Sequence, residues 1–154
     1  RPYRSRRIHI GMDEAWDLGR GRRLSEHGYT PPATLMAEHL RRVREIVNKL
    51  GLEAMMWSDM YFHLDGHHYH SPEMPSQSAI DAVDPRAALV YWDYYHAREE
   101  EYAGALARHA RFPAETIFAV SEVNQQQGAV ANRFSKHRKQ VVSNVINWCR
   151  SGNH

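Results

Sequence analysis

Three short segments of the sequence combine carboxylates with aromatic side chains, residue types that suit a polar, sugar-like or metal ligand. They contain Asp13 and Glu14; Trp57 and Asp59; and Tyr91, Trp92, Asp93 and Tyr94. Two adjacent carboxylates cannot both ionise without cost, so we expect one acid of the first pair to have a raised pKa and to suit a general acid. The aromatic rings offer flat faces for a sugar ring. The alternative is that each acid caps a following helix and that the tryptophans belong to the core.

Each segment comes directly after a stretch that has the pattern of a buried strand. Apolar runs predict strands over residues 8–11, 54–57, 87–92 and 116–120. Helical periodicity predicts helices over residues 33–50, 98–110 and 136–149, with a helical turn near residues 78–82. Alternating strands and helices are typical of an α/β fold with a parallel sheet, in which sites form at the carboxyl ends of the strands. The three segments should therefore converge on one pocket.

The composition excludes several classes of protein. The 154 residues are 42% hydrophobic and 25% charged, as in a folded globular chain. A net charge of +2 gives no electrostatic reason to expect a nucleic-acid partner, and no apolar run approaches the roughly 18 residues of a membrane span. The single cysteine, Cys149, excludes an internal disulfide and favours a reducing compartment such as the cytoplasm. We leave the localisation open because the sequence starts at Arg1 rather than at a methionine.

Four closely spaced histidines raise a second possibility, a metal site. His63, His67, His68 and His70 have spacings that can hold zinc in a loop. No cysteine lies near them in the sequence, and no predicted helix carries them. We therefore interpret them as flexible surface histidines and predict neither a metal nor an organic cofactor.

The stretch Ile8-His9-Ile10-Gly11-Met12-Asp13-Glu14 resembles the H-x-G-x-D-E signature of family-20 glycoside hydrolases, the β-N-acetylhexosaminidases. The segments Trp57-Ser58-Asp59-Met60 and Tyr91-Trp92-Asp93-Tyr94-Tyr95-His96 are also similar to that family, and Gly19-Arg20-Gly21-Arg22 resembles a bacterial branch of it. The resemblance implies a (β/α)8 TIM barrel, of which residues 1–154 would hold about four βα units, strands four to seven. A full barrel takes about 250 residues, so we expect strands one to three and eight to be absent. The exposed strand edges of such a piece would favour aggregation or pairing with another chain.

The resemblance also implies a mechanism and a role for each residue. Family members remove terminal N-acetylglucosamine or N-acetylgalactosamine from β-linked glycans by a substrate-assisted retaining mechanism, in which the acetamido oxygen of the sugar attacks C1. Glu14 matches the general acid and base, and Asp13 matches the residue that holds the acetamido N–H. The implied substrate-binding residues are Trp57 at the acetamido pocket, Tyr91 at the acetamido oxygen, Asp93 at the sugar hydroxyls, His9 behind the acid pair, and Asp59 and Tyr94 beside them. The expected partner is a glycan with a terminal N-acetylhexosamine, and a complete site requires the remainder of the barrel.

One segment departs from the pattern of the family. Relatives continue after the last of these strands with glycines and a W-x-W segment, whereas this chain has no aromatic residue between Phe118 and Phe134. A wall of the sugar pocket is therefore missing or remodelled. Two function classes remain open: a glycosidase that is inactive as this piece alone, and a catalytically silent carbohydrate-binding or scaffold piece of a barrel.

Overall fold

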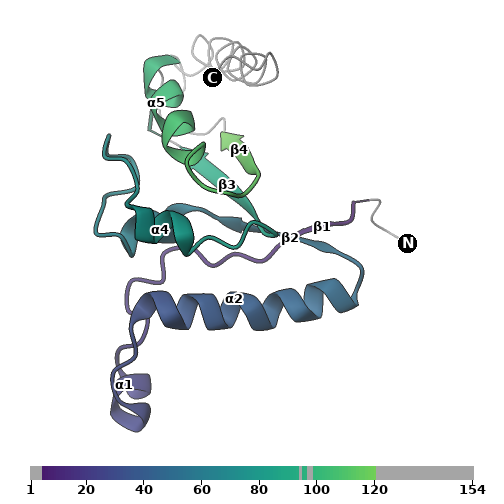
Figure 1. Ribbon diagram of the computed structural model, residues 1–154, viewed down its shortest axis with the longest axis vertical. Coiled ribbons are helices and arrows are strands. Elements are labelled where there is room, and N and C mark those ends of the chain that lie inside the picture. Colours follow the sequence, from purple (N-terminus) through teal and green to yellow (C-terminus); the bar gives the residue numbers. More distant parts are fainter. Residues whose placement is uncertain (1–4, 94, 97–98, 121–154) are drawn as a thin grey trace, which may run out of the picture.

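The computed structural model describes residues 5–93, 95–96 and 99–120 (Figure 1). In this part of the chain, strands alternate with helices along the sequence, as the apolar runs predict. The elements are β1 (Arg7–His9), α1 (Arg22–His27), α2 (Pro32–Lys49), β2 (Glu53–Trp57), α3 (Asp59–His63), α4 (Gln77–Asp81), β3 (Ala88–Asp93), α5 (Glu99–His109) and β4 (Thr116–Val120). The helix predicted over residues 136–149 lies outside the described residues.

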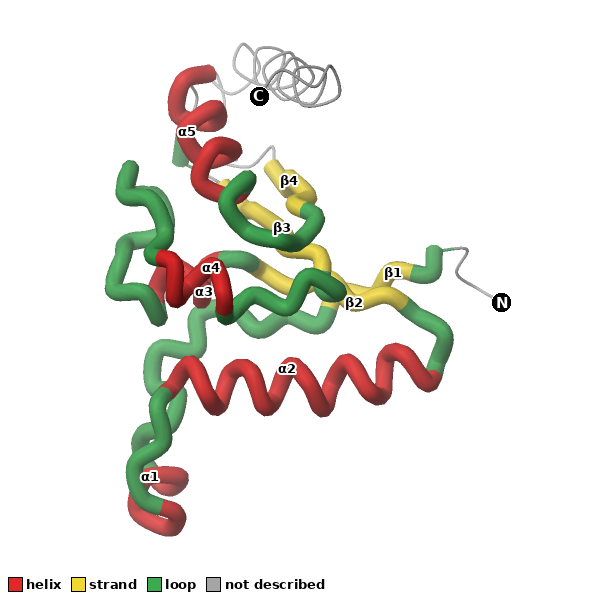
Figure 2. Tube along the Cα trace, in the orientation of Figure 1, coloured by secondary structure: helices red, strands yellow, loops and turns green. Residues whose placement is uncertain are grey.

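The four strands form one parallel sheet in the order β1-β2-β3-β4 (Figure 2). In its register, Ile8 is paired with Ala54 and Met56 with Leu89. Because neighbouring strands are parallel, their carboxyl ends lie at the same edge of the sheet, where the predicted site residues follow. The α/β class and the parallel sheet are confirmed. Within the described residues the sheet is open, with β1 and β4 at its two edges.

The long helix α2 runs alongside the sheet and packs its apolar face against it (Figure 1). It begins at Pro32, which suits the first turn because the N–H group that proline lacks would have no partner inside the helix. Met36, Leu40 and Val47 recur at helical spacing and are buried in the same cluster as the sheet residues. The helix ends before Gly51, whose φ of 68° is a conformation that glycine adopts at little cost.

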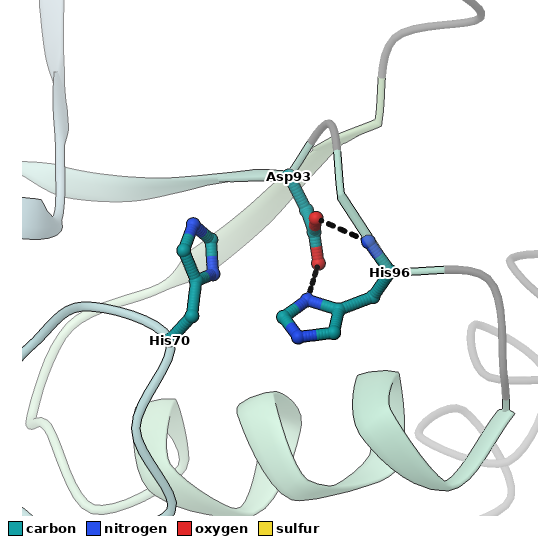
Figure 3. A group of neighbouring side chains, drawn as sticks. All are labelled: His70, Asp93 and His96. Atoms are coloured by element: carbon teal, nitrogen blue, oxygen red, sulfur yellow. Dashed lines mark hydrogen bonds and ion pairs between the residues drawn. The ribbon is translucent and has the colours of Figure 1, made fainter.

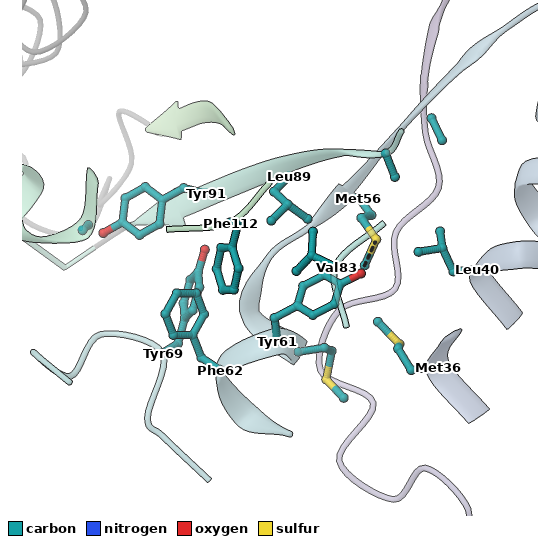
Figure 4. Packing of buried hydrophobic residues seen from close by; sticks show 14 of the residues in the cluster. Met36, Leu40, Met56, Tyr61, Phe62, Tyr69, Val83, Leu89, Tyr91 and Phe112 are labelled. Carbon is teal, nitrogen blue, oxygen red and sulfur yellow. Dashed lines mark hydrogen bonds between the residues drawn. The ribbon is translucent and has the colours of Figure 1, made fainter. Parts of the chain in front are cut away.

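The hydrophobic core is formed by the sheet, α2, α5 and the segment that follows β2 (Figure 4). Met56, Phe62 and Leu89 are fully buried at its centre. An ion pair is buried at its side, where Arg44 of α2 donates a hydrogen bond to Asp84, which follows α4. Burial raises the pKa of the Asp84 carboxyl, but the hydrogen bonds and charges of its arginine neighbours outweigh burial and hold that pKa below its usual range.

Two helices, α1 and α3, lie outside the ranges in which the sequence predicts helices. Helix α1 buries none of its residues and carries an Arg22–Glu26 ion pair of 2.7 Å on its surface, so it has no apolar periodicity to reveal it. Helix α3 has five residues, too few for a periodic pattern, and begins directly after β2. The other predicted elements within the described residues are present, with ends that differ by two residues at most. None of the helices in the described residues has the length and apolar character that crossing a membrane requires.

Candidate functional site

The chain that leaves β1 follows a strained path before it reaches the acid pair. Gly11, Met12 and Glu14 have φ angles of 73°, 71° and 47°. The left-handed region is costly for residues other than glycine, and such strain is concentrated at functional sites. Here it breaks the alternation of the strand. The adjacent carboxylates of Asp13 and Glu14 can therefore line the same cavity.

Asp59, the first residue of α3, fixes the position of Glu14. Its Oδ2 accepts a hydrogen bond of 2.9 Å from the Glu14 backbone N–H. The Asp59 side chain is almost completely buried, and burial raises the pKa of its carboxyl group, with a smaller contribution in the same direction from the charge of Asp13. The predicted residue Asp59 thus lies beside the acid pair, where it supports the strained backbone.

Three aromatic side chains share a cavity with the acid pair. Asp13, Glu14, Trp57, Trp92 and Tyr95 line a cavity of about 220 Å³ at the carboxyl ends of β1, β2 and β3. A second cavity of about 490 Å³ adjoins it, because Glu14, Trp92 and Tyr95 line both. Carboxylates between indole faces can hydrogen-bond sugar hydroxyls while the rings stack on the sugar, so this arrangement suits a carbohydrate.

His9 ends β1 and lies close enough to Asp13 to be influenced by its charge. Its ring packs against Trp57 with a centroid distance of 4.4 Å, and its Nδ1 accepts a hydrogen bond of 3.1 Å from the Gly11 N–H. Burial lowers the pKa of His9, against the opposing effect of the Asp13 charge. A neutral His9 therefore supports both the Trp57 wall and the start of the strained loop.

Tyr91 and Asp93 of the third predicted segment are turned away from these cavities, whereas Trp92 lines both. Asp93 has no exposed surface, and its Oδ2 accepts hydrogen bonds of 2.6 Å from the Tyr91 hydroxyl and 2.7 Å from His96 Nδ1. Its Oδ1 accepts from the backbone N–H groups of Tyr95 and His96. Burial raises the pKa of Asp93, but these donors together lower it below its usual range, so the group is a carboxylate. Neither Tyr91 nor Asp93 lines the two cavities, and Tyr94 lies outside the described residues.

A buried polar network joins the carboxyl ends of β2 and β3. Ser58 Oγ lies 2.6 Å from the Tyr69 hydroxyl, 2.9 Å from His109 Nε2 and 3.2 Å from the Val90 carbonyl oxygen. Tyr69 also accepts from the Trp92 N–H. Since His109 Nδ1 donates to a backbone carbonyl of α5, its Nε2 accepts from Ser58. Sequence reasoning missed Tyr69 and His109, whose contacts span 11 and 51 residues.

The buried His109 predicts a pH-dependent stability. Burial, with a smaller contribution from the Arg108 charge, lowers the pKa of His109 to about 4, and the Ala105 carbonyl opposes this. Tyr69 and Tyr91 are the other titratable groups whose rings face it. In the unfolded chain a histidine takes up its proton near pH 6.5. The unfolded state therefore binds more protons, and stability should fall by about 3 kcal/mol as the pH decreases from about 6.5 to about 4.

Chemical denaturation of His109→Gln across this pH range tests the expectation. The glutamine does not titrate, so the fall in the free energy of unfolding between pH 6.5 and pH 4 should become smaller. His39→Gln on the exposed side of α2 is the matched control and should leave the pH profile as it is. Equal profiles for His109→Gln and the unsubstituted protein would contradict the assignment.

The burial of His70 does not fit the interpretation of His63, His67, His68 and His70 as flexible surface residues. Its side chain is half-buried, and both of its ring nitrogens are shielded from solvent without a hydrogen-bond partner in the described part of the chain. Burial lowers the pKa of His70 to about 4, and the Asp93 charge opposes this. His68 is exposed, in line with the interpretation, and His63 and His67 are intermediate.

No family model matches the sequence, and no curated protein matches it either. The structure brings together His9, Asp13, Glu14, Trp57 and Asp59. It places Tyr91 and Asp93 behind the wall that Trp92 forms.

Proposed function

We propose that this chain is part of the catalytic barrel of a β-N-acetylhexosaminidase and carries its acid pair. The observation that supports this most is the placement of Asp13 and Glu14 on a strained loop at the carboxyl end of β1, facing a cavity walled by Trp57 and Trp92. Sites of α/β barrels form at this edge of the sheet. In this proposal β1 to β4 correspond to strands four to seven, and the remainder of the barrel completes the pocket.

Hydrolysis in this site proceeds in two steps on the sugar. The acetamido oxygen of the substrate attacks C1 while the glycosidic C1–O bond breaks, and the departing oxygen takes the proton of Glu14. Asp13 accepts a hydrogen bond from the acetamido N–H and offsets the positive charge of the oxazolinium ion that forms. Water then adds to C1 and gives a proton back to Glu14. At the same time the bond between C1 and the acetamido oxygen breaks, so the acetamido group is restored and the configuration at C1 is retained.

Asp59 and Asp93 act in this proposal as positioning residues. Asp59 holds the Glu14 backbone, and Asp93 holds Tyr91 and His96 at the end of β3. For Tyr91 to bind the acetamido oxygen, its hydroxyl has to leave Asp93 and turn toward the substrate. The role that the family resemblance implies for Tyr91 therefore requires a rearrangement when the sugar binds.

A second candidate function is a silent carbohydrate-binding piece of a barrel. The inward orientation of Tyr91 and Asp93 favours this alternative, since both groups are engaged with each other rather than facing the cavity. Such a protein would bind the sugar between Trp57 and Trp92 without cleaving it.

The dependence on the acetamido group separates the two candidates. In a protein that carries this chain within a complete barrel, 4-nitrophenyl N-acetyl-β-glucosaminide should be hydrolysed at least about 10³-fold faster than 4-nitrophenyl β-glucoside, which lacks the internal nucleophile. The measurement is kcat/KM by nitrophenol release. Tight binding of an N-acetylglucosamine thiazoline without turnover of either substrate would favour the silent binder. Comparable rates for the two substrates would exclude the substrate-assisted mechanism.

A further inference from the structure

Three metal-ligating side chains meet beside the larger cavity, apart from the acid pair. His70 comes from the loop before α4, Asp93 ends β3, and His96 follows it (Figure 3). One ligand atom from each residue lies within 4.8 Å of the others. His70 and His96 also line the cavity of about 490 Å³, so an ion bound here would have access to solvent.

The environment of His70 is unusual for a histidine without a ligand. Both of its ring nitrogens are buried, and neither has a hydrogen-bond partner within the described residues. Leaving a buried polar group unsatisfied costs about 1–3 kcal/mol. The ring is surrounded by other rings, those of Tyr69, Trp92 and His96, at centroid distances of 4.8 to 5.4 Å. A bound cation would satisfy one of its nitrogens.

Asp93 and His96 are already oriented toward each other. Because a carboxylate only accepts hydrogen bonds, His96 Nδ1 carries the proton in its 2.7 Å contact with Asp93 Oδ2. When Nδ1 binds a metal ion instead, that proton passes through solvent to Nε2 and the ring stays neutral. Two imidazoles and one carboxylate, with a fourth position left for water, form the ligand set of an open zinc site.

The three ligand atoms have to move closer together before they can hold zinc. Zinc lies about 2.1 Å from nitrogen and oxygen ligands, so two ligand atoms of a tetrahedral zinc ion are about 3.4 Å apart. The 4.8 Å limit among the three residues exceeds this separation by about 1.4 Å at most. His70 can make up the difference by rotating, because no hydrogen bond of its ring nitrogens within the described residues opposes the movement.

We propose that His70, Asp93 and His96 form a binding site for Zn²⁺, which ties the histidine-rich loop to the end of β3. The proposal does not depend on the hexosaminidase assignment, since none of its ligands belongs to the acid pair. The metal would serve to fix the loop that forms one side of the larger cavity.

Zinc titration of the untagged protein by calorimetry at pH 7 tests this site. One equivalent should bind, and His70→Phe, which keeps a ring in place but removes both nitrogens, should weaken binding at least about 100-fold. His96→Gln should have a similar effect. The double variant His63→Ala/His68→Ala, which removes two other histidines of the same run, is the control and should bind zinc as the unsubstituted protein does.

Circular dichroism of each zinc-free variant establishes that it is folded. Substitution of Co²⁺ for zinc gives a readout that needs no variant, since two histidine rings should show paramagnetically shifted proton signals. The absence of binding to the unsubstituted protein would overturn the proposal. Zinc binding that is retained in His70→Phe and His96→Gln would also overturn the proposal. Loss of zinc binding in His63→Ala/His68→Ala would assign the ion to those other histidines. Because no sugar is hydrolysed in this experiment, its outcome is separate from that of the proposed activity.

Discussion

Glu14→Gln is expected to lower kcat/KM for a β-linked N-acetylglucosaminide by about 10³-fold in the complete barrel. Glutamine keeps the shape of the side chain and has no proton to give to the departing oxygen, and a positioned general acid contributes about 10² to 10⁴ in rate. The backbone of residue 14 keeps its 2.9 Å hydrogen bond to Asp59, so the loop should stay in place. The loss would therefore report on the carboxyl group itself.

A comparison of two substrates with different leaving groups tests whether Glu14 protonates the departing oxygen. Nitrophenol departs without much help from an acid, whereas the sugar alcohol released from chitobiose needs protonation. The rate for chitobiose should therefore fall further in Glu14→Gln than the rate for the nitrophenyl substrate. Glu26→Gln, which removes an exposed carboxylate of α1, is the matched control and should leave both rates unchanged. Equal losses for the two substrates would argue against Glu14 as the acid, and activity on chitobiose above a tenth of the original would exclude it.

Much of the fold could be predicted from the sequence because buried parallel strands are continuous apolar runs. The stretch that ends at Trp57 and the one that ends at Trp92 are such runs, and both became strands of the parallel sheet. Helix α2 could also be predicted, since Met36, Leu40 and Val47 recur on one face. Helix α1 could not be predicted, because none of its residues is buried and an exposed helix has no apolar pattern.

The candidate site could be predicted in part. Because the sheet is parallel, the carboxyl ends of its strands lie at one edge. Glu14, Trp57 and Asp59 come at or after these ends and lie close together, as expected. The inward orientation of Tyr91 and Asp93 follows from the alternation of a strand, which sends residues 91 and 93 to one face when Trp92 faces the cavity. The burial of His70 and His109 depends on contacts between distant segments. No local pattern in the sequence signals such contacts.

A large loss of stability is expected when the buried ion pair beside the core loses its acid. Asp84→Ala leaves the guanidinium of Arg44, which is 6% exposed, without its carboxylate. An unpaired charge in such a position destabilises a protein by about 3–5 kcal/mol. The other arginine at this carboxylate, Arg86, is mostly exposed and regains water, so it adds little to the loss. Chemical denaturation at pH 7 measures the free energy of unfolding.

An exposed ion pair on the same helix provides the comparison. Glu45→Ala removes the partner of Arg41 on the solvent side of α2 and should cost no more than about 1 kcal/mol. The double variant Arg44→Met/Asp84→Ala should recover most of the loss, because it removes the uncompensated charge and keeps apolar volume at the site. A loss below 1 kcal/mol in Asp84→Ala would mean that water reaches Arg44. Failure of the double variant to recover would mean that the loss comes instead from the contacts of Asp84 with the loop after α4. Recovery would identify the buried charge of Arg44 as the source of the loss.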